Sequence, residues 1–132
     1  MGQPAAKLGD KVTATDTHII LVPAPPGPPV PTPIPHPFLG VITTGVSANV
    51  MIMGQPAATV GSGATNTPPH VPLAPGTFQV PPTNQGTVMS GSATVMINGK
   101  PAARNGDTAT TCNDPAPLPI GTVVAVGTVM IG

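Results

Sequence analysis

The chain lacks most of the residues that usually stabilise a small protein. Its 132 residues include no Trp, no Tyr, no Glu and only two Phe, Phe38 and Phe78. It has a single cysteine, Cys112, so an intrachain disulfide is excluded. Small chains with little apolar core usually need a disulfide or a metal as a staple. A bound metal is therefore the staple that the composition leaves open.

Charged residues are also scarce. Four Lys or Arg balance four Asp, and no charged residue stands between Thr17 and Gly99. Without a basic patch, nucleic acid is a poor candidate partner. Pro, Gly and polar residues interrupt the uncharged stretch, so no segment is apolar for the length that spans a bilayer. The N-terminus has no basic region followed by an apolar one, so we expect no secretory signal and no stable membrane insertion.

Proline and glycine are abundant, with 21 and 16 copies. Such a content is common in disordered chains, but disordered chains are usually charged and poor in apolar residues. Here only 6% of residues are charged and the mean hydropathy is +0.26. Helices are nearly excluded, because Pro or Gly interrupts almost every window of ten residues. The composition predicts an ordered all-β domain of short strands.

One short phrase occurs three times. Gly-Gln-Pro-Ala-Ala occupies residues 2–6 and 54–58, and Gly-Lys-Pro-Ala-Ala occupies residues 99–103. A hydrophobic phrase precedes the second and third copies, at 49–52 and 94–97, and its remaining copy ends the chain at 128–131. The repeat is therefore circular. It predicts three equivalent units around an axis, closed by pairing of the two chain ends.

The repeats define a single domain over residues 1–132, with turns near 2–10, 54–62 and 99–107. Runs rich in Val, Ile and Thr between glycines predict strands. We expect hairpins that pair 41–44 with 49–53, 87–89 with 94–97, and 122–124 with 128–131. We expect short outgoing strands at 11–15, 64–67 and 108–111.

Three proline-rich connectors separate the units, at residues 21–37, 68–82 and 115–119. Such segments are often flexible linkers or ligands for aromatic-lined grooves. Because one connector follows each repeat, we favour stiff extended segments that cross from one unit to the next.

The metal-binding side chains follow the repeat. His18 and His70 each come fourteen residues after a repeat proline, Cys112 comes eleven after Pro101, and His36 lies on a connector. If the units surround an axis, these four side chains converge on one side of the turns. Four nitrogen and sulfur ligands form the closed tetrahedron of structural zinc. Iron is the main competing metal, because imidazole suits it too.

Three other function classes are weaker. A zinc hydrolase needs an open coordination position and a base, but Cys112 would fill that position and the chain has no Glu. A cysteine nucleophile needs a free thiol, which a metal would occupy. A proline-rich adaptor is supported only by residues 25–29. We therefore expect a structural protein rather than an enzyme.

The third copy continues into Arg104, so that residues 101–104 read Pro-Ala-Ala-Arg. With the repeats and the set of three His and one Cys, the chain resembles the PAAR and PAAR-like proteins that cap the spike of contractile injection systems. These systems include type VI secretion and extracellular phage-tail-like particles. Lys7 and Thr59 stand where Arg104 stands, so the role of that arginine stays open.

The resemblance implies a small pseudo-threefold β-cone with a zinc ion near its apex, held by His18, His36, His70 and Cys112. It implies a non-enzymatic tip that sharpens a trimeric VgrG-like spike, one copy per trimer, and helps to pierce the target envelope. An adaptor that attaches effectors to the spike is the alternative. We expect the protein to be made in the bacterial cytoplasm and delivered at the tip of the particle. Because the repeats occupy the whole sequence, we expect no fused toxin domain.

Overall fold

The computed structural model describes residues 2–132 as strands, turns and loops, with no helix in that range. Among these residues there is accordingly no helix that could cross a bilayer. The strands are β1 (Gln3–Pro4), β2 (Lys11–Val22), β3 (Val30–Thr44), β4 (Met51–Ile52), β5 (Gln55–Pro56), β6 (Gly63–Asn66), β7 (Thr77–Phe78), β8 (Gln85–Val88), β9 (Met96–Ile97), β10 (Lys100–Pro101), β11 (Thr108–Thr111), β12 (Leu118–Val124) and β13 (Met130–Ile131). The prediction of an all-β fold is confirmed.

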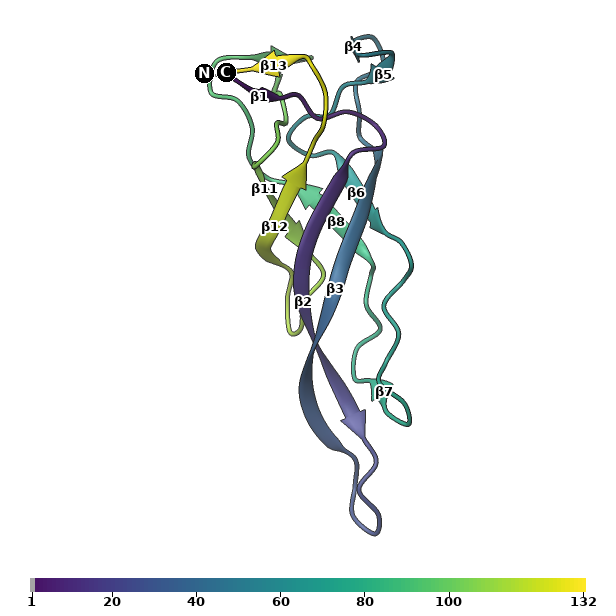
Figure 1. The fold of residues 1–132 in the computed structure, drawn as a ribbon. Coiled ribbons are helices and arrows are strands. Elements are labelled where there is room, and N and C mark those ends of the chain that lie inside the picture. Colours follow the sequence, from purple (N-terminus) through teal and green to yellow (C-terminus); the bar gives the residue numbers. More distant parts are fainter. Residues whose placement is uncertain (1) are drawn as a thin grey trace.

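Six strands form a closed cone. Their order is β12-β11-β8-β6-β3-β2, and β12 also pairs with β2, which closes the ring. The short strand β7 pairs with the C-terminal end of β2, where Ile20 lies opposite Phe78. The cone narrows from a broad end, where both termini lie, to the tip of the long β2–β3 hairpin (Figure 1).

The broad end, called the base below, consists of three matching two-stranded hairpins. Ile52 pairs with Gln55 in β4–β5, and Ile97 pairs with Lys100 in β9–β10. The third hairpin, β1–β13, joins the two ends of the chain in the same register, with Ile131 opposite Gln3. The predicted circular repeat is confirmed by this pairing.

The three units are joined at their centre by a cycle of backbone hydrogen bonds. Ala6 N–H donates to the Ala103 carbonyl at 2.9 Å, Ala103 donates to Ala58 at 3.0 Å, and Ala58 donates to Ala6 at 3.0 Å. All three alanines are fully buried. The repeated Pro-Ala-Ala phrase thus supplies a small side chain where three backbones meet.

The core lies in two layers. The layer nearer the base contains Ile52, Ile97 and Ile131 with one alanine from each unit. The second layer surrounds the single buried aromatic, Phe38. A Cβ atom on Gly40 would lie 2.6 Å from Phe38 Cε1, so the phenyl ring occupies space that glycine leaves. One large ring among small residues thus fills the centre of the cone.

The three hairpins predicted from sequence are wrong in their pairing. Residues 41–44 belong to β3 and pair with β2 and β6, whereas β4 pairs across a two-residue turn with β5. Likewise β8 pairs with β6 and β11, and β12 pairs with β11 and β2. Met53 and Gly54 have φ values of 51° and 82°, the left-handed pair that a tight hairpin turn requires. The repeated turn therefore lies inside the β4–β5 and β9–β10 hairpins, and not after them.

The connector at 21–37 is extended, but it does not cross between units as one segment. It includes the end of β2, a turn, and the start of β3, with Val22 opposite Val30. Residues 68–82 form an irregular loop that contains β7, and 115–119 lead into β12. The first connector is thus the tip of a hairpin.

Candidate functional site

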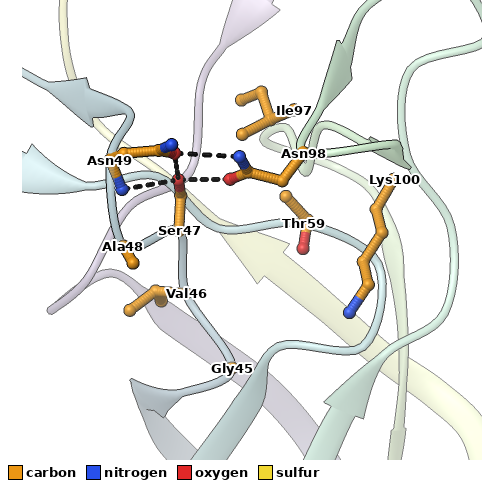
Figure 2. Close-up of a pocket in the computed structure, with 9 residues that line it drawn as sticks. All are labelled: Gly45, Val46, Ser47, Ala48, Asn49, Thr59, Ile97, Asn98 and Lys100. Carbon is orange, nitrogen blue, oxygen red and sulfur yellow. Dashed lines mark hydrogen bonds between the residues drawn. The ribbon is translucent and has the colours of Figure 1, made fainter.

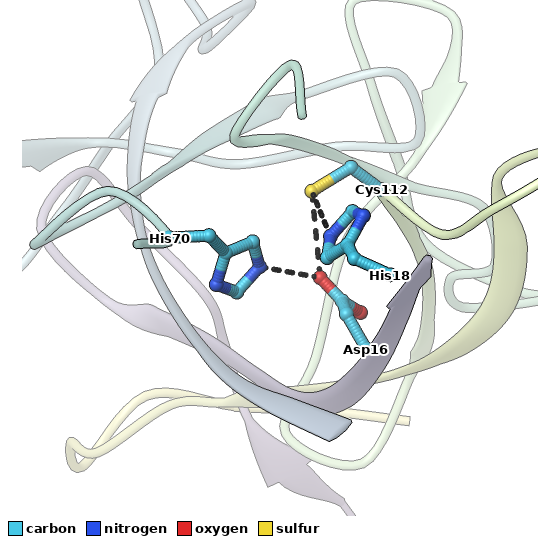
Figure 3. Close-up of side chains that lie close together, drawn as sticks. All are labelled: Asp16, His18, His70 and Cys112. Atoms are coloured by element: carbon cyan, nitrogen blue, oxygen red, sulfur yellow. Dashed lines mark hydrogen bonds and ion pairs between the residues drawn. The ribbon is translucent and has the colours of Figure 1, made fainter. Parts of the chain in front are cut away.

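Four side chains of metal-binding type meet inside the cone, next to the second core layer, to which Cys112 belongs. Asp16 and His18 come from β2, His70 from the loop after β6, and Cys112 from the residue after β11 (Figure 3). Their ligand atoms all lie within 4.8 Å of one another. Side chains alternate between the two faces of β2, so Asp16 and His18 share the inward face. Three strands of the closed sheet thereby bring residues distant in sequence to one point.

The distances suit a bound ion. Cys112 Sγ lies 3.7 Å from His18 Nε2 and 3.4 Å from Asp16 Oδ2, and His70 Nε2 lies 3.1 Å from that same oxygen. Ligands at the bond lengths typical of tetrahedral zinc are about 3.3–3.7 Å apart, so the two distances from Cys112 match this range and the His70–Asp16 distance is slightly shorter. The donor set of imidazole, thiol and carboxylate also matches zinc and related transition metals. The cluster can therefore hold a metal ion.

His36, the remaining predicted ligand, lies beside these four residues. Its ring centroid is 5.4 Å from that of His18 and 5.3 Å from that of His70. Its Nδ1 donates a hydrogen bond to the Ile34 carbonyl at 2.9 Å, so Nε2 is the ring nitrogen without a proton in the neutral side chain. The structure thus groups His18, His70 and Cys112 with Asp16, and places His36 against the two other imidazoles.

Each imidazole also has a neighbour on its outer side. His18 Nδ1 is buried without a hydrogen bond, and Asp114 Oδ2 lies 3.5 Å away. His70 Nδ1 faces the Asn66 amide at 3.3 Å. Histidines that bind metals usually engage an outer partner through the nitrogen that does not coordinate. The arrangement fits three imidazoles that present Nε2 to a common centre.

The acidic residues fall into two groups. Asp10 and Asp107 pair with Lys7 and Arg104 near the base. Asp16 and Asp114 lie instead against His70 and His18, and within residues 2–132 neither forms an ion pair with a Lys or Arg. Buried carboxylates need a compensating positive charge. A metal ion would supply it.

Burial changes the pKa values of two of these groups, and in each case the change favours the neutral form. It lowers the pKa of His18, against the opposing effect of Asp114. It raises the pKa of the Cys112 thiol to about 11, and the adjacent Asp16 adds to the rise. A divalent ion reverses this preference at the thiol, because a coordinated thiolate no longer needs its proton. The thiol is therefore poorly suited to act as a free nucleophile.

The comparison with protein families gives a match in the C-terminal part of the chain. Residues 78–132 match the family model of the PAAR motif. The chain carries a PAAR motif. This confirms the resemblance drawn from the repeats, and it supports a spike-associated structural role in contractile injection systems. We found no significant match to a curated protein.

The matched segment covers the third repeat, and the other two repeats have the same backbone bonds. Val60 N–H donates to the Pro101 carbonyl at 3.0 Å, Asn105 donates to Pro4 at 2.8 Å, and Leu8 donates to Pro56 at 2.8 Å. Each unit thus bonds to the next by the same contact. The PAAR geometry therefore extends through all three repeats.

The arginine of the motif has a visible partner. Arg104 forms an ion pair with Asp107 at 2.9 Å, and the Asp107 carboxylate also accepts the Arg104 backbone N–H at 2.6 Å. Lys7 and Asp10 repeat this pair in the first unit. In the second unit Thr59 and Ser62 replace both charges, and the Ser62 hydroxyl accepts the Thr59 N–H. Arg104 and Asp107 therefore form a pair that closes the turn, and the second unit replaces both members of this pair.

The base is held together by contacts from each loop to the neighbouring turn. Ser47 Oγ donates to Asn98 Oδ1, and Asn98 Nδ2 donates to Asn49 Oδ1 at 2.8 Å (Figure 2). Ser92 Oγ donates to the Gly132 carbonyl, and Thr128 N–H approaches Met53 Sδ at 3.4 Å. Met51, Met96 and Met130 remain 56–57% exposed at matching places in the three hairpins. The base therefore presents one exposed methionine from each of the three units.

Sequence reasoning missed Asp16 and Asp114 as members of the cluster. The signal for Asp16 is its place two residues before His18, because residues two apart on a strand share a face. Asp114 carries no such signal, because it reaches His18 only through the fold.

Proposed function

We propose that this protein is the non-enzymatic tip of an injection spike, stapled by one zinc ion and docked through its base on a trimeric VgrG-like protein. One copy caps one trimer and helps the particle to pierce a target envelope. The protein is made in the bacterial cytoplasm and leaves it at the tip of the particle.

The match between the three base hairpins is the observation that carries this proposal. The same register recurs in β1–β13, β4–β5 and β9–β10, and each hairpin exposes one methionine to the same extent. A single chain with three equivalent contacts can meet each subunit of a trimer in the same way. Exposed apolar side chains and short strand edges are typical of a surface that a partner covers.

The centre supports the second part of the proposal. His18, His70 and Cys112, with His36 beside them, would hold the ion, and the ion would fix β2, β3 and β11 to one another. Phe78 lies over the cluster, with ring centroids 5.7 Å from His18 and 5.6 Å from His36. The chain's second aromatic thus shields the centre, as a structural site requires.

Co-expression with the cognate spike tests the docking. Native mass measurement should give one copy of this chain per trimer, and the complex should resist moderate salt because the base contact is mainly apolar. A ratio of three to three, or dissociation on raising the salt concentration alone, would contradict the proposal.

A pair of variants locates the contact. Met96→Asp places a charge in the base and should weaken docking at least about tenfold. Val30→Asp changes an equally exposed apolar residue at the far hairpin tip and should leave docking unchanged. If the two variants weaken docking equally, the base is not the contact surface.

A further inference from the structure

Asp16 is the most unusual side chain of the centre, because it is a fully buried carboxylate in a chain with few charges. Its two oxygens have different surroundings. Oδ1 accepts hydrogen bonds from the Thr111 hydroxyl and from Asn113 Nδ2, the latter at 3.2 Å. Both donors are uncharged and hold the carboxylate against β11. Oδ2 is left to point into the cluster of metal-binding atoms (Figure 3).

The contacts of Oδ2 depend on protons that a metal would displace. Without an ion, the groups that can donate to Oδ2 are His70 Nε2 at 3.1 Å and the Cys112 thiol at 3.4 Å. Metal binding requires a thiolate and an imidazole nitrogen free of its proton. Both donors would then be lost, and a buried oxygen would lie next to a thiolate. Only the ion itself could compensate that oxygen.

We propose that Asp16 binds the ion directly through Oδ2, so that the centre has an oxygen ligand in addition to imidazole and thiolate. The proposal rests on the metal centre of the proposed function: Asp16 with His18, His70 and Cys112 makes the four ligands of a tetrahedral site, and His36 lies beside them. Oδ1, anchored by Thr111 and Asn113, fixes the direction of the carboxylate before the ion arrives. Asp16 thereby couples the ion to β11 as well as to β2.

The test compares two buried carboxylates beside the same histidines. Asp16→Asn removes the proposed ligand, whereas Asp114→Asn alters a carboxylate on the outer side of His18. Zinc affinity is measured by competition with a chromophoric chelator. A hollow of about 150 Å³ is lined in part by His18, Cys112 and Asp114, and through it a small solute can approach the cluster. We expect Asp16→Asn to weaken zinc binding more than about 100-fold and Asp114→Asn about 10-fold.

The visible absorption spectrum of Co²⁺-loaded protein reports on the metal ligands themselves. It would not change if Asp16 only supported the fold. In Co²⁺-loaded protein, Asp16→Asn should shift the visible ligand-field bands and keep the thiolate-to-metal band, because Cys112 still binds. Asp114→Asn should leave both sets of bands in place. If Asp16→Asn does not fold, Thr111→Val keeps the carboxylate but removes one of its anchors, and should weaken zinc binding without loss of the thiolate band.

The outcomes separate the two proposals. If wild-type protein binds no transition metal, the metal centre itself is wrong. If it binds zinc tightly and Asp16→Asn binds it as well, with unchanged cobalt bands, then Asp16 is not a ligand.

Discussion

The base and the metal centre are built in opposite ways. The base repeats one hairpin, one backbone bond and one turn three times, and its two acidic residues each have a Lys or Arg partner. The metal centre draws two side chains from β2 and others from β3 and two loops, and its two acidic residues have only histidines and hydrogen-bond donors as neighbours. Repetition therefore stabilises one end of the cone, and in our proposal a metal ion stabilises the other.

The difference follows from what each region can bury. The base has three matched isoleucines and three alanines in one layer, so apolar contacts and backbone bonds suffice there. The centre buries carboxylates, imidazoles and a thiol, which favour the folded state only when their charges are compensated. Substitutions at the base should therefore change the stability equally with and without metal. The effect of substitutions at the centre on stability should depend on whether metal is bound.

The largest effect should come from removing residues 128–132. This deletion removes β13, and with it the buried Ile131 and the Val129 carbonyl that accepts the Ala5 N–H at 2.8 Å. Although chain ends usually tolerate truncation, this one completes the first unit by pairing with β1. We expect no cooperative thermal transition in circular dichroism. Removal of Gly132 alone, which loses only the bond from Ser92, is the matched control and should fold.

Metal removal should have the next largest effect. Cys112→Ser should lower the stability of metal-loaded protein by several kcal/mol, a fall of roughly 10 °C or more in Tm. In excess chelator the variant and the wild type should melt close together. Calorimetry with and without zinc measures both differences.

The base supplies the control for that experiment. Ile97→Val removes one buried methylene from the base layer and should cost about 1 kcal/mol. Because Ile97 is remote from the metal centre, the loss should be the same with zinc and with chelator. A metal-dependent loss for Ile97→Val would mean that the two regions do not act separately.

How far the sequence predicts this molecule differs between the same two regions. The base could be anticipated, because three copies of Gly-x-Pro-Ala-Ala and the circular order of the flanking phrase define the units and the pairing of the chain ends. The β4–β5 pairing could not, because Met53 in a left-handed turn has no propensity signal of the kind that Asn98-Gly99 gives for β9–β10. Local patterns thus predicted the units but assigned the strands to wrong neighbours.

At the centre, the side chains of His18, His70 and Cys112 were predicted to converge, and the structure brings them together. The ligand set as a whole, including His36, stays a prediction. Asp16 was missed although it shares a strand face with His18. Asp114 could not be found from spacing, because its contact depends on how the loop after β11 folds over β2. Clusters made from unrelated segments are specified by tertiary structure and leave little trace in sequence.

A smaller effect is expected at the turn pairs of the base. The second unit uses Thr59 and Ser62 where the third uses Arg104 and Asp107. Arg104→Thr or Asp107→Ser alone leaves one charge without its partner, whereas the double variant recreates the neutral pair. Denaturant unfolding should show a coupling of about 0.5–1 kcal/mol, modest because Arg104 is partly exposed. Strictly additive losses would mean that the pair does not act as a unit.

The smallest effect on stability should come from the outer edge of β3, which lies beyond both regions. Pro33 and Pro35 stand opposite Ile19 and Thr17 of β2. The N–H groups of Ile19 and Thr17 point away from β3, to Asp114 and Asn113. Opposite residues in an antiparallel pair orient their backbone groups alike. The two proline nitrogens therefore face the open edge of β3, where no described strand pairs with them. Because proline has no N–H group, this edge has no backbone hydrogen-bond donor at these two positions.

Replacing both prolines should therefore alter association and leave the fold intact. Pro33→Val with Pro35→Val adds two N–H groups to an exposed edge without disturbing the ladder to β2, so stability should change by less than about 0.5 kcal/mol. An edge with donors and acceptors can pair with another copy, and we expect dimers or larger species in sedimentation analysis at high concentration. Pro25→Val in the turn of the hairpin adds a donor outside the strand and should stay monomeric. If both variants remain monomeric, the alternating prolines do not protect the edge.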